Sequence, residues 1–192
     1  AASLALAAGS VLAIVLPAVA VPAAGVALLL LAAWLLRHDV ARATVRASGL
    51  PRYVAVCLLS GYVWLLVAGA GWLLAGDPGT GPVHDAVVHA IFLGFVITMI
   101  MAHAPVILPA VLGVRVEYHP VLYIPVALLH ASLLLRVVAG DAWGSVEALR
   151  IGGFGAVVAM LLFGVTAATV SVRAALLRRR RRRREETRDA AA

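Results

Sequence analysis

The sequence predicts an all-α fold, a polytopic transmembrane helical bundle, and three observations lead to this prediction. Hydrophobic residues make up 64% of the 192 residues and charged residues only 13%, whereas soluble domains are close to half apolar and a quarter charged. The mean hydropathy is +1.03. The apolar residues fall into runs separated by short polar or glycine- and proline-rich breaks, the pattern of helices that cross a bilayer. We therefore expect a multi-pass protein of the cell membrane whose main partner is the lipid bilayer.

About six transmembrane helices are expected. The first two apolar runs cover residues 4–21 and 26–36. Two short crossings with a turn near residues 17–25 fit these runs better than one long helix, although a cleaved signal peptide is an alternative for the first run. The other four spans are expected at residues 53–75, 85–112, 120–139 and 148–177.

Positive charge predicts how these spans are oriented, because basic loops stay on the cytoplasmic side. Four arginines lie in the loop at residues 37–52, and a further run, Arg178–Arg184, follows the last span. An even number of spans then places both termini in the cytoplasm. The chain divides into a transmembrane helical domain, residues 1–177, and a basic cytoplasmic tail, residues 178–192, which is expected to be disordered.

The net charge of +7 does not indicate a nucleic-acid partner, because much of it lies in that tail and the apolar body has no room for a soluble nucleic-acid-binding fold. We interpret the tail as a topology anchor that faces lipid headgroups. The single cysteine, Cys57, cannot form an internal disulfide and is expected to be a small buried side chain.

Three histidines inside the fourth and fifth spans are the main candidate functional residues, because ionisable side chains in lipid are costly and usually mark function. His89 and His103 are fourteen residues apart. At 3.6 residues per turn they fall on nearly the same helix face, roughly 21 Å apart along the axis. His130 lies near the middle of the next, antiparallel span, at a depth within ~10 Å of His103.

Two facing imidazoles at one depth can hold a metal ion or the iron of a haem. The alternative is that each histidine only forms a hydrogen bond across a helix interface. Arg136 follows His130 by six residues. It either extends to the membrane interface or binds a carboxylate, the candidates being a haem propionate, Asp85 and Asp141.

Several sites can be excluded. The sequence has no Walker loop, no Gly-x-Ser-x-Gly, no His-Glu-x-x-His and no Cys-x-x-Cys-His, which excludes a covalent c-type haem. It offers no nucleophile–base pair for hydrolysis within the membrane. Whether the protein is an enzyme is left open, and an oxidoreductase is the class we expect if it is one.

Residues 89–95, His-Ala-Ile-Phe-Leu-Gly-Phe, and 101–113, Met-Ala-His-Ala-Pro-Val-Ile-Leu-Pro-Ala-Val-Leu-Gly, carry a resemblance to a known family. The chain resembles membrane proteins related to subunit I of haem-copper oxidases, above all the NnrS-type group linked to nitric oxide and nitrogen-oxide metabolism. The resemblance covers residues 84–145. The His-Pro-Glu-Val-Tyr segment and the adjacent histidine pair that bind copper in true oxidases are missing here. The resemblance therefore implies haem binding through His89, His103 or His130, not oxygen reduction.

From these observations we expect haem b, with His103 and His130 as axial ligands and His89 at a second site, in electron transfer or in the handling or sensing of nitric oxide. Other membrane subunits or an electron-transfer protein are the expected partners. Two alternatives stay open. One is a histidine-lined protein for transport or insertion of copper or another metal, and the other is a non-catalytic structural subunit of a membrane complex.

Overall fold

The computed structural model describes residues 17–76, 79–112 and 118–189, and every regular element within them is helical. Four elements are simple α-helices: α2 (Pro17–His38), α3 (Ala41–Thr44), α4 (Leu50–Ala75) and α8 (Val146–Asp189). Two long helices are composite. One consists of α5 (Pro82–His89), the π-helix η1 (Ala90–Ile97) and α6 (Thr98–Leu112), and the other of the 3₁₀-helix η2 (Pro120–Leu122), α7 (Tyr123–Leu134) and the π-helix η3 (Leu135–Ala142).

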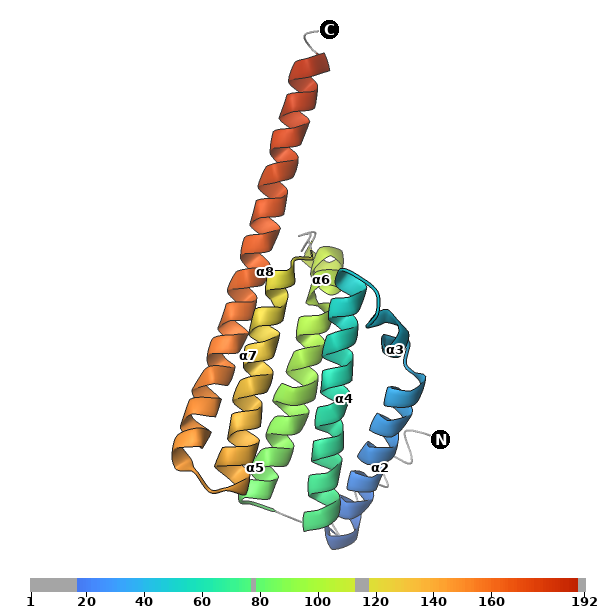
Figure 1. Cartoon of the computed structure of the whole chain (residues 1–192), viewed down its shortest axis with the longest axis vertical. Helices are drawn as coiled ribbons and strands as arrows, with labels where there is room; N and C mark the ends of the chain where they lie inside the picture. Colours follow the sequence, from blue (N-terminus) through green and yellow to red (C-terminus); the bar gives the residue numbers. More distant parts are fainter. Residues whose placement is uncertain (1–16, 77–78, 113–117, 190–192) are drawn as a thin grey trace.

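The long helices stand side by side and alternate in direction, as Figure 1 shows. Within the described residues, five of them are long and apolar enough to cross a membrane. They are Ala18–His38, Leu50–Ala75, Pro82–Ile107, Pro120–Ala142 and Val146–Arg173. The expectation of an all-helical bundle is confirmed for the described residues, and these five helices have the length and apolar character that a membrane span needs.

The prediction of a turn near residues 17–25 is wrong, because helix α2 continues through these residues without a break. The apolar run 26–36 is only about 16 Å long as a helix, whereas the hydrocarbon core is about 30 Å thick. The helix needs the residues before it to reach that length. Pro22 lies inside α2 and removes one backbone donor, which membrane helices tolerate. The rest of the first expected span, residues 4–16, lies outside the described residues.

The last helix also extends beyond its expected end. The basic tail was expected to be disordered from residue 178, but α8 continues to Asp189. Arginine and glutamate are good helix formers, and residues 178–189 contain neither glycine nor proline to end the helix. In Figure 1 this part of α8 projects beyond the rest of the bundle.

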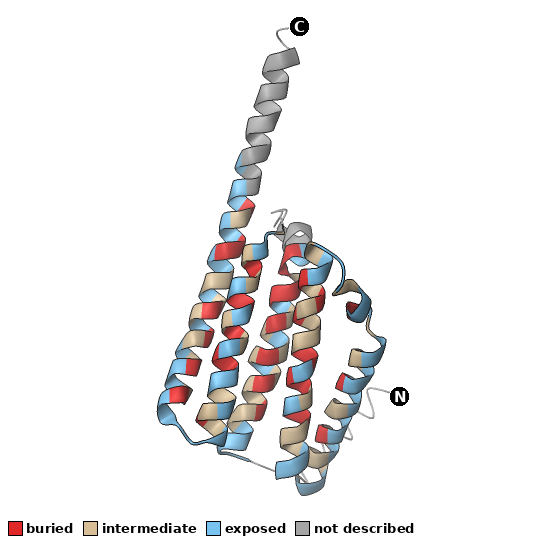
Figure 2. Cartoon of the chain, viewed as in Figure 1, coloured by how far each residue is buried: buried red, intermediate tan, exposed pale blue. Residues whose placement is uncertain are grey.

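The centre of the bundle is α4, which packs against α2, α5, η1 and α6. In its most apolar stretch 44% of the residues are buried, compared with 11% in α2, a contrast visible in Figure 2. Cys57 on α4 is fully buried and free, as expected. It belongs to a core cluster with Tyr53, Met101 and Leu129, so α4 connects the fourth and fifth expected spans.

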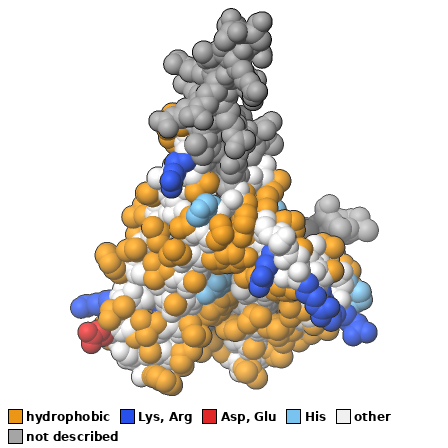
Figure 3. All heavy atoms as spheres, turned by 45° about the horizontal axis from the view of Figure 1, so that its top comes forward, with side chains coloured by type: hydrophobic (Ala, Val, Ile, Leu, Met, Phe, Trp, Pro, Cys, Tyr) orange, Lys and Arg blue, Asp and Glu red, His pale blue; other side chains and the backbone are white. Residues whose placement is uncertain are grey.

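Hydrophobic side chains cover most of the bundle surface in Figure 3, and charged side chains gather near its ends. We call one end the arginine end. It holds α3 and the start of α4, and its basic residues are Arg37, Arg42, Arg46, Arg52 and Arg173. We call the opposite end, with the loops after α4 and after η3, the acidic end. The charged residues that the structure describes there are Asp85, Arg136, Asp141, Glu147 and Arg150.

Helix α2 lies very close to α4 because two glycines face each other at their crossing. A Cβ atom on Gly69 would lie 2.9 Å from the carbonyl oxygen of Gly25 and 2.9 Å from a side-chain carbon of Leu29. A Cβ atom on Gly25 would lie 2.6 Å from the backbone nitrogen of Leu73. Such contacts with backbone atoms cannot be relieved by a change of rotamer, so the two helices approach closely only because both positions lack a side chain.

We therefore expect Gly69→Ala to lower the free energy of unfolding by roughly 1–3 kcal/mol, as overpacking of a close contact does. Thermal unfolding in detergent measures this change. Gly164→Ala is the matched control, because Gly164 on α8 has no neighbour within 4 Å of the added carbon. Alanine there should be neutral or stabilising. Equal stability of the two variants would contradict the close crossing.

Candidate functional site

His130, on α7, faces α4 and has both ring nitrogens in hydrogen bonds. The indole Nε1–H of Trp64 donates to Nδ1 at 2.8 Å. The hydroxyl oxygen of Ser60 lies 3.1 Å from Nε2, and that hydroxyl donates to the carbonyl of Cys57 at 2.9 Å. The rings of Trp64 and His130 are nearly parallel, with an interplanar angle of 4° and centroids 6.4 Å apart.

The directions of these bonds fix the tautomer of His130. Indole can only donate, so Nδ1 is the acceptor and the proton of the neutral ring lies on Nε2. Nε2–H then donates to Ser60, which passes its own hydrogen to a backbone carbonyl. Every polar atom in this series of hydrogen bonds therefore has a partner within the protein. Neither nitrogen of His130 is free to bind iron or another metal unless one of these bonds is lost.

His103 has a different environment. Its Nδ1 lies 2.8 Å from the carbonyl oxygen of Met99, one turn earlier on the same helix. A carbonyl can only accept, so Nδ1 carries the proton and Nε2 of the neutral ring keeps its lone pair. His103 lines an open hollow of about 420 Å³ on the surface of η1 and α6. The other lining residues are Val96, Met99, Ile100, Ala104 and Ile107.

The hollow faces away from the bundle. Ile100 is 56% exposed and Ile107 is 52% exposed, and all six lining residues come from this one helix. His103 and His130 therefore do not share one site: His103 lies on the outer surface of α6, whereas His130 is bonded to α4. The expectation that they face each other as two axial ligands has no support in this geometry.

The π-helix η1 separates His89 from His103 and changes their relative orientation. The expectation of a common face assumed 3.6 residues per turn throughout. A π-helix has hydrogen bonds from i to i+5 and therefore rotates less per residue. Across the eight residues of η1, this difference turns α6 about the helix axis relative to α5. His89, on α5 before η1, lies beside Asp85 one helical turn earlier, whereas His103, after η1, lines the open hollow.

His89 belongs to a polar cluster at the acidic end, formed by α5 and η3. Its Nδ1 lies 2.8 Å from the backbone oxygen of Asp85 and 3.4 Å from the carboxylate of the same residue. Arg136 donates to that carboxylate through Nε at 3.1 Å and Nη2 at 2.7 Å. Its Nη1 donates to the carbonyl of Leu149 on α8. Of the partners considered for Arg136, the structure therefore selects Asp85, and the guanidinium joins three helices.

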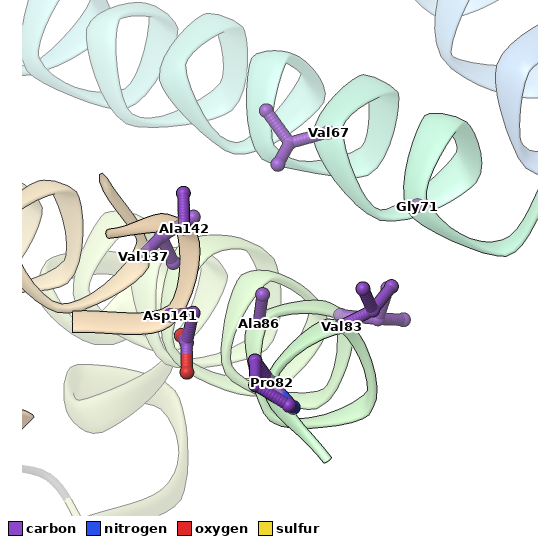
Figure 4. Close-up of a pocket in the computed structure, with 9 residues that line it drawn as sticks. Val67, Gly71, Pro82, Val83, Ala86, Val137, Asp141 and Ala142 are labelled. Carbon is purple, nitrogen blue, oxygen red and sulfur yellow. The ribbon is translucent and has the colours of Figure 1, made fainter. Parts of the chain in front are cut away.

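Asp141 lies next to this cluster and interacts with Asp85, Arg136 and His89. Its Oδ2 is buried and has no hydrogen-bond partner among the described residues. Asp141 also borders a cavity of about 160 Å³ between α4, α5 and η3. Figure 4 shows its carboxylate turned away from Val67 on the opposite wall. The remaining walls are apolar, and they consist of Val67, Gly71, Pro82, Val83, Ala86, Val87, Val137 and Ala142.

The other histidines lie near the ends of the helices. His38 stacks on Trp34 at 5.2 Å between ring centroids, and His119 accepts a hydrogen bond from the backbone nitrogen of Val121. Within the described ranges, no group of three or more histidine, cysteine, aspartate or glutamate side chains is arranged to hold a metal ion. A site built from several ligands of this one chain therefore has no support among them.

Sequence reasoning missed the partners of His130. Ser60 and Trp64 are 70 and 66 residues away from it in the chain, and nothing in their local pattern links them to the fifth span. The one available signal was that they lie four residues apart, on one face of the third span, so both can reach the same neighbour.

A family model described as Domain of unknown function (DUF8744) matches residues 1–172. The comparisons with curated proteins and with solved structures gave no match.

Proposed function

Because the chain belongs to this family of unknown function, we propose from its own geometry that it is a multi-pass membrane protein that binds haem b, with His103 as an axial ligand. Its role would be electron transfer or the handling or sensing of nitric oxide. The resemblance of residues 84–145 to NnrS-type proteins supports the same cofactor. Of the expected ligand set, this proposal retains His103 as a ligand. It gives His130 and Arg136 structural roles, because both form hydrogen bonds within the protein.

The observation that carries the proposal is the imidazole of His103 in its hollow. The Met99 carbonyl holds Nδ1–H at 2.8 Å, and such a second bond fixes the ring orientation and raises the basicity of the metal-binding nitrogen. Nε2 is left unprotonated in an apolar hollow of about 420 Å³. In a membrane-facing position an unpaired ring nitrogen is costly, so a ligand for it is favoured.

The residues present fit one face of a haem. The hollow supplies one nitrogen ligand, a thioether from Met99 and apolar walls from Val96, Ile100 and Ile107. Apolar walls suit the porphyrin ring. When bound, haem would supply an iron that exchanges single electrons or binds nitric oxide. The chain itself would orient the ligand through Met99 and keep water from the covered face.

We place the protein in the cell membrane with the arginine end in the cytoplasm, since basic segments stay on that side. The C-terminus then lies in the cytoplasm. Six spans with both termini on that side are part of the same proposal.

The test is the visible spectrum and haem content of the protein purified after expression with haem supplied. We expect a Soret band for the wild type and its loss, with at least a tenfold lower haem content, in His103→Ala. His84→Ala is the control, because His84 is an exposed residue of the first turn of α5 and its loss should leave the spectrum unchanged. A wild type that binds no haem, or an unchanged spectrum in His103→Ala, would contradict the proposal.

The second candidate is a structural subunit whose histidines only support packing. The specific observation in its favour is His130, whose two nitrogens are both satisfied by α4. The same purified samples separate the candidates. No haem and no bound metal in the wild type would favour the structural subunit, whereas bound copper lost in His103→Ala would favour a metal transport or insertion protein.

A further inference from the structure

Among the residues that the structure describes, the proposed haem site has no second ligand. The hollow offers one imidazole, and its other lining residues are on the same helix, so none of them can approach the iron from the opposite side of the porphyrin. His130 is bonded to α4 through both nitrogens, and His89 lies in the cluster with Asp85 and Arg136. The remaining histidines lie at helix ends: His38 is the last residue of α2, His84 lies in the first turn of α5, and His119 precedes the span that begins at Pro120.

We infer that the second axial ligand is His103 of a second copy of this chain, so that one haem lies between two α6 surfaces. This inference rests on the proposed function. Two copies with the same orientation in a membrane are related by a twofold axis along the membrane normal, and such an interface is self-complementary. Equivalent residues then lie at the same depth, so each His103 meets its counterpart at one level.

The surface around His103 is suited to this contact. Val96, Ile100 and Ile107 are 37%, 56% and 52% exposed, and Ala104 is small. The lining contains no aspartate, glutamate, lysine or arginine, so the twofold operation would not bring like charges together. The open side of the hollow, which a single chain leaves uncovered, would be closed by the matching hollow of the second copy.

Three measurements on the full chain, purified in detergent and in lipid nanodiscs, test the inference: haem per chain, mass of the haem-containing particle and iron spin state. We expect one haem per two chains, a dimeric mass and a low-spin iron with two imidazole ligands. A haem-containing monomer, one haem per chain, or a five-coordinate high-spin iron would overturn the second-copy ligand while leaving haem binding intact. A protein without any haem would overturn the inference together with the proposed function.

A pair of surface variants separates a lost interface from lost folding. Ile100→Trp places a large apolar side chain in the contact and keeps His103, and we expect a monomer that has lost the low-spin spectrum. Ile124→Trp is the matched control, because Ile124 on α7 is also 56% exposed and should retain the dimer and the spectrum. Helical content by circular dichroism should be equal in both. An unchanged dimer and spectrum in Ile100→Trp would overturn the inference.

Discussion

Gly94→Ala is expected to lower the free energy of unfolding by about 2 kcal/mol and to displace the ring of Trp64. An added Cβ atom would lie 2.4 Å and 2.5 Å from the Cγ and Cβ atoms of Trp64, so α4 and η1 would have to separate. Alanine favours a helix over glycine by about 1 kcal/mol, and the overpacking must exceed this gain. The displaced indole would also lose its hydrogen bond to His130, leaving a buried nitrogen without a donor.

Two measurements follow this change. Thermal unfolding in detergent reports the stability, and near-ultraviolet circular dichroism reports the packing of Trp64 against His130. Gly164→Ala is again the reference, because it brings the same gain in helix propensity while its added Cβ atom has no neighbour within 4 Å. A Gly94→Ala protein with the stability of the Gly164→Ala protein and an unaltered aromatic spectrum would show that α4 and η1 do not pack as closely as described.

Arg136→Leu is expected to destabilise the protein by roughly 2–4 kcal/mol. The Arg136 and Asp85 side chains are 17% and 35% exposed, so the pair lies between the surface case, worth at most about 1 kcal/mol, and the buried case, in which removing one partner costs 3–5 kcal/mol. Removing the guanidinium leaves the Asp85 carboxylate beside Asp141 with no cation bound to it. The α8 carbonyl of Leu149 also loses its donor.

Unfolding in detergent of Arg136→Leu, Asp85→Leu and the double variant measures the coupling between the two residues. We expect the double variant to be more stable than the sum of the two single changes predicts, because it no longer holds an unpaired charge. Arg150→Leu is the control, since Arg150 is exposed on α8 and its loss should cost less than about 0.5 kcal/mol. Additive single changes would show that the ion pair does not stabilise the bundle.

The sequence alone was sufficient to locate four of the five long apolar helices. The expected spans at 53–75, 85–112, 120–139 and 148–177 each lie within a helix or a composite helix of the structure. This follows because a membrane span satisfies its backbone hydrogen bonds within itself and is identified by its length and apolar content, which are local properties. The expected turn near residues 17–25 was wrong for a related reason, since an eleven-residue run is too short to cross alone.

The rotation of each helix about its axis, and with it the choice of side chains that meet, depends on the packing of the whole bundle. His103 faces outward because the π-helix η1 turns α6 relative to α5. Both ring nitrogens of His130 are hydrogen-bonded, because Ser60 and Trp64 contact it from a helix that is distant in the sequence. Arg136 forms its ion pair with Asp85 on the neighbouring span. Hydropathy contains no information on these rotations, because an apolar residue suits lipid and a neighbouring helix equally well.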